Sequence, residues 1–305
     1  MSALFEEALK NRKIEYRRFV STATLCSFRI GGPAATVVEP SCLGELTEAV
    51  ALCRKMNKPF AVIGRGTNLL FDDGPIDVVL IRTTSLCGVR FLGEGRVKAL
   101  CGTPLPQLAS LCAARGLSGL SFAAGIPGTL GGALLMNAGA CGKEMASVVR
   151  SVQYYDPVDD KIKTLFNQEL SYSYRNSVFQ SNSGVILSAE LDLSPIRPST
   201  EIFAEMKALL EKRRATQPLE FPSAGSTFRR PSPNVPLSKL LDDLGLKGKR
   251  IGGAAVSEKH AGFIVNLGDA TARNVRALIL EIQNLVEGEC GIRPIPEIRF
   301  IPSQP

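Results

Sequence analysis

A glycine-rich stretch in the first half of the chain has the residue types that bind phosphate groups. Residues 123–142 read A-A-G-I-P-G-T-L-G-G-A-L-L-M-N-A-G-A-C-G. Glycine has no Cβ and adopts positive φ without strain, so the backbone N–H groups of such a loop can approach a pyrophosphate closely. Tight packing between loops explains isolated glycines, but six glycines within 18 residues favour an anion-binding loop.

A second, shorter loop has the same character. The apolar residues 60–63 predict a strand that runs into Gly64-Arg65-Gly66-Thr67-Asn68. A short G-x-G also occurs in ordinary turns, so this loop alone is weak evidence. Together the two loops suit an extended dinucleotide held between them. Neither has the Rossmann G-x-G-x-x-G spacing or the P-loop G-x-x-x-x-G-K-[ST] spacing, which argues against both of those folds.

The elements that would position these loops follow from periodicity and capping residues. The first part of the chain predicts a helix capped by Ser41 that reaches about Lys58, strands over 60–63 and 77–82, and a helix capped by Thr103 that ends just before Gly116. It also predicts paired strands over 148–155 and 161–166 around an Asp159-Asp160 turn, and a strand over 184–193. After a predicted domain boundary near residue 199 we expect a helix over 201–214, a loop over 216–236, a short helix near 238–244, a strand over 262–266, a helix over 271–287 and a strand over 297–301. This helix count favours an α+β arrangement over regular β-α-β winding.

The bulk properties are those of a soluble protein with more than one packed unit. A chain of 305 residues exceeds one typical domain, and 45% hydrophobic with 21% charged residues is an ordinary globular composition. Residues 1–18 lack the apolar centre of a secretory signal, and no uncharged apolar run approaches the ~20 residues that span a bilayer. We therefore expect a cytoplasmic protein.

Charge and cysteine content exclude two further classes. The net charge is +7, but the basic residues are dispersed, which is typical of a solvated surface rather than a nucleic-acid interface. The same charge would suit a site for phosphorylated small molecules. The eight cysteines form no C-x-x-C pair, so we expect them to be reduced and buried, and we expect no zinc site.

Seven segments, in order along the chain, resemble the family of UDP-N-acetylenolpyruvoylglucosamine reductases, flavoenzymes that make UDP-N-acetylmuramate. They are Ser27 to Ala34, the loop from Gly64 to Leu70, the Gly125 to Gly142 stretch, Tyr174-Arg175-Asn176-Ser177, Ala224-Gly225-Ser226-Thr227-Phe228, Gly252 to Asn266, and Pro296-Glu297-Ile298-Arg299. The resemblance covers nearly the whole chain, and an ordered set of this kind is specific.

The resemblance implies a two-lobed FAD-binding region of the vanillyl-alcohol-oxidase (PCMH) type over residues 1–199, with lobes of about 1–85 and 86–199, and a C-terminal α+β substrate-binding domain over 200–305. It implies non-covalent FAD, NADPH as hydride donor, and UDP-N-acetylglucosamine-enolpyruvate as substrate in peptidoglycan synthesis. We expect a monomer with small-molecule partners and no nucleic-acid, membrane or metal partner. The expected cofactor-binding residues are Ile63, Gly64, Arg65, Gly66, Thr67, Asn68, Leu69, Ala124, Gly125, Ile126, Pro127, Gly128, Gly131, Gly132, Asn137 and Gly139.

The resemblance also implies three catalytic residues: Arg175 from Y-R-x-S, Ser226 from A-G-S-T-F, and Glu297 from P-E-I-R. Hydride addition to the outer carbon of an enolpyruvyl ether builds negative charge on the substrate carboxylate, and Arg175 is a permanent cation that suits this charge. Ser226 would then give a proton to the carbanion, and Glu297 would assist or orient a proton source. Singly, such residues are more often a surface cation, a turn serine and a solvated glutamate, so the hypothesis depends on all three falling within the family's motifs.

Five further residues are expected near the substrate: Tyr174, Arg213, Gln217, Arg229 and His260. Arg213, Gln217 and Arg229 flank the Ser226 loop and would meet the nucleotide diphosphate, whereas a packed structural role is as good an interpretation of His260. Arg175 and Ser226 are 51 positions apart, too few for the tyrosine-bearing loop of one branch of the family, so we expect the shorter branch. Cys141 stands where the family commonly has an aromatic residue.

Two other functions fit parts of the pattern. A flavoprotein oxidase of the same fold would use oxygen and often tethers FAD through a histidine in its flavin domain, but no histidine precedes His260. A non-catalytic nucleotide-binding protein would keep the glycine loops without redox activity. A covalent flavin would favour the oxidase, and reduction kinetics separate the reductase from the binding protein.

Overall fold

The structure is a computed structural model that describes residues 2–194, 196–231 and 237–302. Contacts between Cα atoms divide the chain into two compact units. Unit 1 comprises the residues up to Arg18, Thr36–Arg65 and Val78–Arg213, and unit 2 comprises Phe19–Ala35, Gly66–Asp77 and the residues from Arg214 onward. The sequence predictions describe the fold class correctly: the chain is α+β.

The first sheet has four strands in the order β1-β2-β5-β3, and both β2 and β3 run parallel to β5. The strands are β1 (Tyr16–Ser21), β2 (Pro33–Val38), β3 (Phe60–Ile63) and β5 (Val79–Arg82). Helix α1 (Ser2–Asn11) precedes β1, and helix α2 (Leu43–Lys55) lies between β2 and β3 in the chain. Helix α2 buries Leu46, Val50 and Cys53 at helical spacing, as its sequence predicts. It begins one residue later than expected, because Cys42 is its N-cap while Ser41 donates from its hydroxyl to the Glu45 carboxylate.

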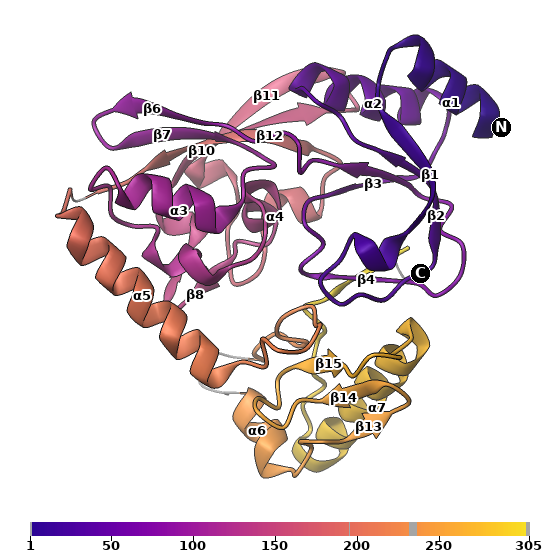
Figure 1. Ribbon diagram of the computed structural model, residues 1–305, viewed down its shortest axis with the longest axis vertical. Coiled ribbons are helices and arrows are strands. Elements are labelled where there is room, and N and C mark those ends of the chain that lie inside the picture. The colour runs from indigo at the N-terminus through magenta and orange to yellow at the C-terminus, as the bar shows by residue number, and fades with distance from the viewer. Residues whose placement is uncertain (1, 195, 232–236, 303–305) are drawn as a thin grey trace. The chain divides into compact units, whose positions relative to one another are not determined.

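The second sheet has five strands in the order β11-β10-β12-β7-β6, all antiparallel (Figure 1). The strands are β6 (Val89–Gly93), β7 (Arg96–Leu100), β10 (Val149–Asp156), β11 (Lys161–Phe166) and β12 (Val185–Asp192). The predicted pairing of β10 with β11 is confirmed, with Asp156 opposite Lys161. Asp160 turns the chain at φ +53°, a conformation that aspartate tolerates better than most residues.

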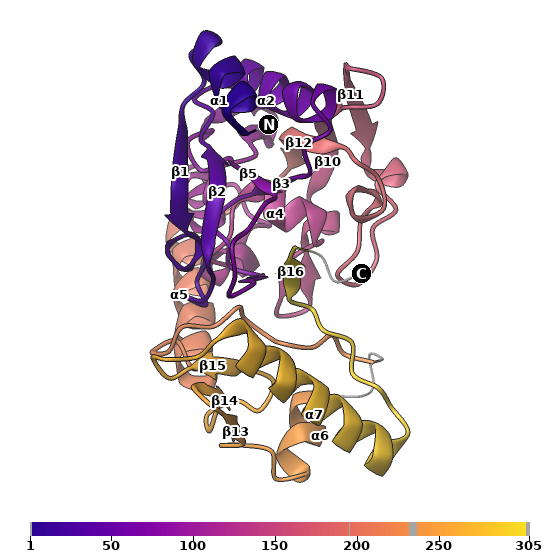
Figure 2. The same ribbon diagram turned by 90° about the vertical axis from the view of Figure 1, so that its right-hand side faces the viewer.

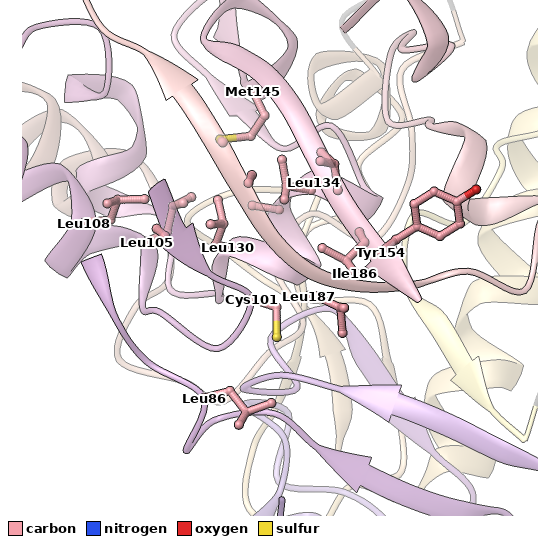
Figure 3. Close-up of a cluster of buried hydrophobic side chains, with 14 of the residues drawn as sticks. Leu86, Cys101, Leu105, Leu108, Leu130, Leu134, Met145, Tyr154, Ile186 and Leu187 are labelled. Carbon is pink, nitrogen blue, oxygen red and sulfur yellow. The ribbon is translucent and has the colours of Figure 1, made fainter. Parts of the chain in front are cut away.

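The core of unit 1 lies where α3 (Leu105–Ala113) and α4 (Leu130–Leu135) pack near the second sheet (Figure 3). Leu105 and Leu108 of α3, Leu130 and Leu134 of α4 and Leu187 of β12 are fully excluded from solvent. Each such side chain stabilises the fold by roughly 1.5–3 kcal/mol through burial. Helix α4 therefore anchors the glycine-rich stretch, of which it is part, to a rigid sheet.

Unit 2 contains a small sheet in the order β13-β14-β15, and helix α7 packs against it (Figure 2). Its elements are β4 (Leu69–Phe71), α6 (Leu237–Asp243), β13 (Arg250–Ile251), β14 (Ala254–Val256), β15 (Ile264–Asn266), α7 (Ala272–Cys290) and β16 (Arg299–Ile301). Thr271 caps α7 by accepting from the amide of Asn274, and Gly291 ends the helix at φ +66°. The last strand, β16, pairs in parallel with β4.

Two N-terminal segments of the chain complete unit 2. Ser27 donates from its hydroxyl to the carbonyl of Ser223 at 2.6 Å, and the side-chain amide of Asn266 donates to the carbonyl of Phe28 at 3.1 Å. The carboxylate of Asp73 accepts from the amides of Ala272 and Arg273, the first two residues of α7, at 2.6 and 3.0 Å. These bonds fasten the segments around residues 27 and 73 to the C-terminal part.

Helix α5 (Ser199–Thr216) belongs mostly to unit 1, although the sequence suggests a boundary before it. Its Ile202 and Met206 are buried in the unit 1 core, so the contact boundary falls after Arg213. The division into 1–199 and 200–305 as functional domains stays a prediction. Of the predicted loop over 216–236, residues 232–236 lie outside the described part of the chain, and residues 217–231 contain no helix or paired strand of the sheets above.

All eight cysteines are free, but they are not all buried. Cys26, Cys53, Cys101 and Cys112 are buried, and burial raises the pKa of the Cys101 thiol to about 12. The expectation of burial is wrong for Cys42, Cys87 and Cys141, which are exposed because they lie in connecting segments rather than on core faces. None of the helices in the described residues is both long and apolar enough to span a membrane.

Candidate active site

The glycine-rich stretch folds as a series of short turns in unit 1. It contains the end of η2 (Ser121–Gly125), helix α4, and a small hairpin of β8 (Gly139–Ala140) with β9 (Lys143–Glu144). Between η2 and α4, the carbonyl of Gly128 accepts from the amide of Leu105 at 3.0 Å. The amides of Gly128 and Thr129 donate to no backbone carbonyl of the described residues, so they are available to an anion.

The two predicted loops meet at Gly64 and Thr129. A Cβ added to Gly64 would lie 2.2 Å from the hydroxyl oxygen of Thr129, far closer than a Cβ approaches an atom to which it is not bonded. Close packing also explains Gly139, whose added Cβ would lie 2.4 Å from the carbonyl oxygen of Lys143. A Cβ added to Gly132 would lie 3.8 Å from Thr129 Oγ1, an ordinary van der Waals contact. The glycines thus bring the loops together and also keep their amides accessible, and this arrangement fits a pyrophosphate.

Asn137 and Arg175 fasten the neighbouring segment to the glycine-rich stretch. The buried Asn137 adopts φ +42°, donates to the carbonyl of Ser173 at 3.0 Å and accepts from the amide of Ala146 at 2.9 Å. Both ends of its amide are therefore used within the protein, which favours a positioning role over contact with a cofactor. Arg175, at φ +56°, donates from Nη2 to the carbonyl of Gly139 at 3.0 Å, and its guanidinium carbon lies 5.0 Å from the ring centre of the partly exposed Tyr174. The predicted catalytic arginine is thus tied to the predicted cofactor loop.

The loop after β3 is divided between the units. Ile63, Gly64 and Arg65 belong to unit 1, whereas Gly66 to Leu69 belong to unit 2. Gly66 has φ +64° and accepts at its carbonyl from the amide of Ser27. The side chain of Asn68 donates to the carbonyl of Glu297 at 3.0 Å, and Leu69 pairs with Arg299.

Four other predicted cofactor residues lie in or beside the glycine-rich stretch of unit 1. Ala124 is buried, Ile126 half-buried and Pro127 exposed, and the amide of Gly131 donates to the carbonyl of Cys101 at 2.7 Å. A Cβ added to Gly131 would lie 3.1 Å from Cβ of Cys101, so close packing favours glycine at this position. In unit 2, Thr67 is half-buried.

Ser226 and Glu297 lie on neighbouring segments of unit 2. The amide of Glu297 donates to the carbonyl of Thr227 at 2.8 Å, and Phe228 pairs with Pro296. The amide of Thr227 in turn donates to the carbonyl of Gly262 at 2.8 Å. Gly225, at φ +78°, turns the chain just before Ser226. This network fixes the backbone of both residues. Among the described residues the exposed Ser226 hydroxyl makes only a 3.4 Å bond, to the carbonyl of Phe228, and it can reorient toward a ligand.

Two arginines in unit 2 form a positive centre near these residues. The Nε of Arg229 is buried and has no hydrogen-bond partner among the described residues. Burial, together with the charge of Arg229, lowers the pKa of the Arg299 guanidinium. Neither guanidinium has an acidic partner in the described part of the chain, so the pair suits an anion. Sequence analysis did not single out Arg299, although it is the last residue of the P-E-I-R motif.

His260 and Gln217 have different surroundings. The Nδ1 of His260 accepts from the amide of Gly262 at 3.1 Å, and its ring packs edge-on against Phe263. Burial lowers the pKa of the imidazole, so the ring is neutral near pH 7. These contacts favour a structural role. The side-chain oxygen of Gln217 is buried and has no partner among the described residues, so it is available to a donor.

Comparisons with known proteins cover nearly the whole chain. A family model described as the FAD binding domain matches residues 34–165, and one described as the C-terminal domain of UDP-N-acetylenolpyruvoylglucosamine reductase matches residues 217–301. The chain is 42% identical over 296 residues to the UDP-N-acetylenolpyruvoylglucosamine reductase of Caldanaerobacter subterraneus subsp. tengcongensis, covering 97% of this chain and 96% of that protein. It is 39% identical over 302 residues to the reductase of Anoxybacillus flavithermus, covering 99% of each.

A solved structure agrees with these relatives. The crystal structure of UDP-N-acetylenolpyruvylglucosamine reductase from Thermus caldophilus matches with a TM-score of 0.79 and 32% identity, over 94% of this chain and 98% of that one. The expected fold, an FAD-binding region followed by a C-terminal α+β domain, is confirmed by the two family models and this structure.

Proposed function

The chain belongs to the family of UDP-N-acetylenolpyruvoylglucosamine reductases and is an oxidoreductase with an FAD-binding domain, and from this premise we propose that it reduces UDP-N-acetylglucosamine-enolpyruvate to UDP-N-acetylmuramate with NADPH. The reaction would serve peptidoglycan synthesis in the cytoplasm, with the protein acting as a monomer. The observation that carries the proposal is the paired backbone that holds Ser226 and Glu297 together in unit 2.

The residues of unit 1 suit the cofactor. FAD, reduced by NADPH, would supply the hydride that adds to the outer carbon of the enolpyruvyl ether. The amides of Gly128 and Thr129 would donate to its pyrophosphate, since they are not used by the backbone of the described residues. Gly64 and Thr129 keep the two loops in contact. The remaining residues of both loops that sequence analysis assigns to the cofactor are part of this proposal, with Gly131 and Asn137 positioning the loop rather than contacting the cofactor.

Three side chains would then act on the substrate. The guanidinium of Arg175 would bind the substrate carboxylate and stabilise the charge that builds there during hydride addition, and one such contact typically lowers a barrier by ~2.7–4 kcal/mol. The hydroxyl of Ser226 would donate its proton to the adjacent carbon. Glu297 would orient that hydroxyl or the proton source that restores it. Its backbone pairing with Thr227, next to Ser226, supports this assignment.

The nucleotide end of the substrate would meet the positive centre of unit 2. Arg229 and Arg299 lack acidic partners among the described residues, and two guanidinium groups match the geometry of a diphosphate. The unpartnered oxygen of Gln217 would accept a hydrogen bond from the nucleotide. Tyr174 would complete the substrate contacts, and the packed His260 would support the fold of unit 2.

Absorption spectroscopy and half-reaction kinetics test the proposal. We expect the purified protein to show flavin bands, NADPH to bleach them without oxygen, and the enolpyruvyl substrate to restore them with one UDP-N-acetylmuramate formed per flavin. Acid denaturation should release the flavin into the supernatant. Protein that takes up no FAD, or reduced flavin that reacts with oxygen but not with the enolpyruvyl substrate, would contradict the proposal, and the second result would favour an oxidase.

A further inference from the structure

Arg213, near the end of α5, lies against the start of the glycine-rich stretch. A Cβ added to Gly125 would lie 3.1 Å from Cδ of Arg213 and 3.7 Å from its Nη1. Gly125 is the last residue of η2, three positions before the available amide of Gly128. The guanidinium group of Arg213 is therefore held within unit 1, beside the loop that we assign to the cofactor.

The charge of Arg213 is not compensated within the described residues, 2–194, 196–231 and 237–302. Arg213 is half-buried, and burial lowers the pKa of its guanidinium. Two other cations, one just before this helix and one on it, are paired: Arg197 with Glu201 and Glu205, and Lys207 with Glu211. A partly buried cation without a counter-charge destabilises a folded protein, so a ligand that brings negative charge explains its presence.

We propose that Arg213 is a binding residue for the diphosphate group of FAD. The inference rests on the proposed function, since it requires FAD in the glycine-rich stretch. The planar fork of guanidinium donors can contact two phosphate oxygens while the amides of Gly128 and Thr129 contact others.

Sequence analysis assigns Arg213 to the diphosphate of the nucleotide substrate. FAD contains the same chemical group, so an arginine that binds diphosphate could serve either molecule. The neighbours of Arg213 in the substrate assignment, Gln217 and Arg229, belong to unit 2, whereas Arg213 packs on Gly125 within unit 1. The contact with Gly125 therefore favours the cofactor as the source of the diphosphate.

Titration of FAD into the flavin-free full-length protein tests this assignment. Arg213→Met keeps the length of the side chain and removes its charge, and we expect the Kd for FAD to rise about 10- to 100-fold. Arg213→Lys should recover part of the loss. Arg214→Met is the matched control, because it removes the same charge at the next, exposed position, and its Kd should equal that of the wild type.

Thermal unfolding separates a binding role from a structural one. Without FAD, Arg213→Met should melt at the wild-type temperature or above it, because the variant loses an uncompensated cation. With saturating FAD its gain in melting temperature should be smaller than that of the wild type. A structural arginine would instead give an apoprotein that melts lower.

Three outcomes would overturn the inference. The first is equal FAD affinity in Arg213→Met and in a wild type that does bind FAD. The second is a lower melting temperature of the variant apoprotein with an unchanged gain on adding FAD. The third is an unchanged Kd for FAD with a raised KM for the UDP substrate, which would assign Arg213 to the substrate instead. A wild type that binds no FAD would overturn the proposed function itself.

Discussion

At the residue level, the hydroxyl of Ser226 is the group whose chemistry can be isolated most cleanly. It is exposed in unit 2, and its one hydrogen bond within the described part of the chain is a long one to the carbonyl of Phe228. We expect Ser226→Ala to leave the reduction of the bound flavin by NADPH near the wild-type rate, because that step needs no proton from Ser226. Its reoxidation by the enolpyruvyl substrate should slow by about 10²–10⁴-fold, the usual contribution of a positioned acid. Stopped-flow absorbance measures both half-reactions, and equal slowing of the two would exclude Ser226 as the proton donor.

Gly64 allows the two loops to pack together, because a side chain at this position would collide with Thr129. In Gly64→Ala the new methyl group would lie 2.2 Å from Thr129 Oγ1 and 3.2 Å from its Cγ2, so the threonine side chain or the loop must shift to make room. We expect a loss of roughly 1–3 kcal/mol in the free energy of unfolding, together with weaker FAD binding. Urea denaturation and FAD titration measure the two effects.

A double mutant separates this clash from other consequences of adding a methyl group. Gly64→Ala combined with Thr129→Ala removes both clashing threonine atoms, so it should be more stable than the sum of the single variants predicts. Gly74→Ala is the control, because nothing lies within 4 Å of the position of its Cβ. Strict additivity of the two substitutions would show that the packing of Thr129 on Gly64 is not what requires glycine there.

Candidate site residues can be identified from the sequence where they fall in a motif. The contacts and charge state of a buried residue cannot. The glycine-rich stretch and the Ser226 and Glu297 motifs carry their own signal in spacing and composition. The sequence did not indicate that both ends of the Asn137 amide are used inside unit 1, or that Arg299 lies close enough to Arg229 to lower its pKa. These properties depend on contacts between segments far apart in the chain, which no local pattern encodes.

At the element level, one carboxylate joins three strands of the first sheet. Glu39 follows β2 and accepts from Arg17 of β1 at 2.7 Å and from Arg82 of β5 at 3.2 Å. Burial alone would raise the pKa of Glu39, but the two arginines outweigh it and hold the pKa below its ordinary value of 4.5. The carboxylate is therefore protonated more readily in the unfolded chain than in the folded one.

The direction of the Glu39 shift fixes how stability depends on pH. The stabilisation is complete above the unfolded pKa and is lost as the pH falls through the lower, folded pKa. Glu39→Gln should therefore cost about 1 kcal/mol near pH 7, and the difference from the wild type should vanish at strongly acidic pH. Urea denaturation from pH 7 down to 3 measures this, with Glu94→Gln as control, because the Glu94 side chain is exposed and its ion pair with Arg96 is long, at 3.7 Å. A difference that stayed constant over that range would exclude the ion pairs as its cause.

Strong periodicity made most long elements predictable, and short ones escaped. The helices α2, α3, α5 and α7 and the hairpin of β10 and β11 occur within a few residues of their predicted bounds. Strands β4 and β16 have three residues each and pair with each other. The sequence analysis predicted β16 but not β4, because three residues are too few to show a strand pattern reliably. Helix α4 lies inside the glycine-rich stretch, where glycine disfavours a helix, and its buried Leu130 and Leu134 overcome that preference.

At the level of the whole molecule, unit 2 is not contiguous in sequence. Its C-terminal part binds the carbonyl of Phe28 through Asn266, the hydroxyl of Ser27 through Ser223, and the carboxylate of Asp73 through the first amides of α7. Strand β16 has its parallel partner in β4, which also comes from the N-terminal part of the chain. A family model that starts at residue 217 therefore covers only some of the residues that unit 2 needs.

This arrangement predicts that residues 214–305 do not fold alone. The fragment would lose the partner of β16 and the carboxylate that caps α7, and it would leave the side-chain amide of Asn266 without its acceptor, each a loss of roughly 1 kcal/mol or more in a unit of marginal stability. Circular dichroism and amide NMR should show no cooperative unfolding for the fragment. Co-expression with residues 1–213 supplies the missing segments and should restore a folded complex. Cooperative unfolding of the fragment alone would mean that its own core suffices, and that the N-terminal segments only lie against a domain that is already complete.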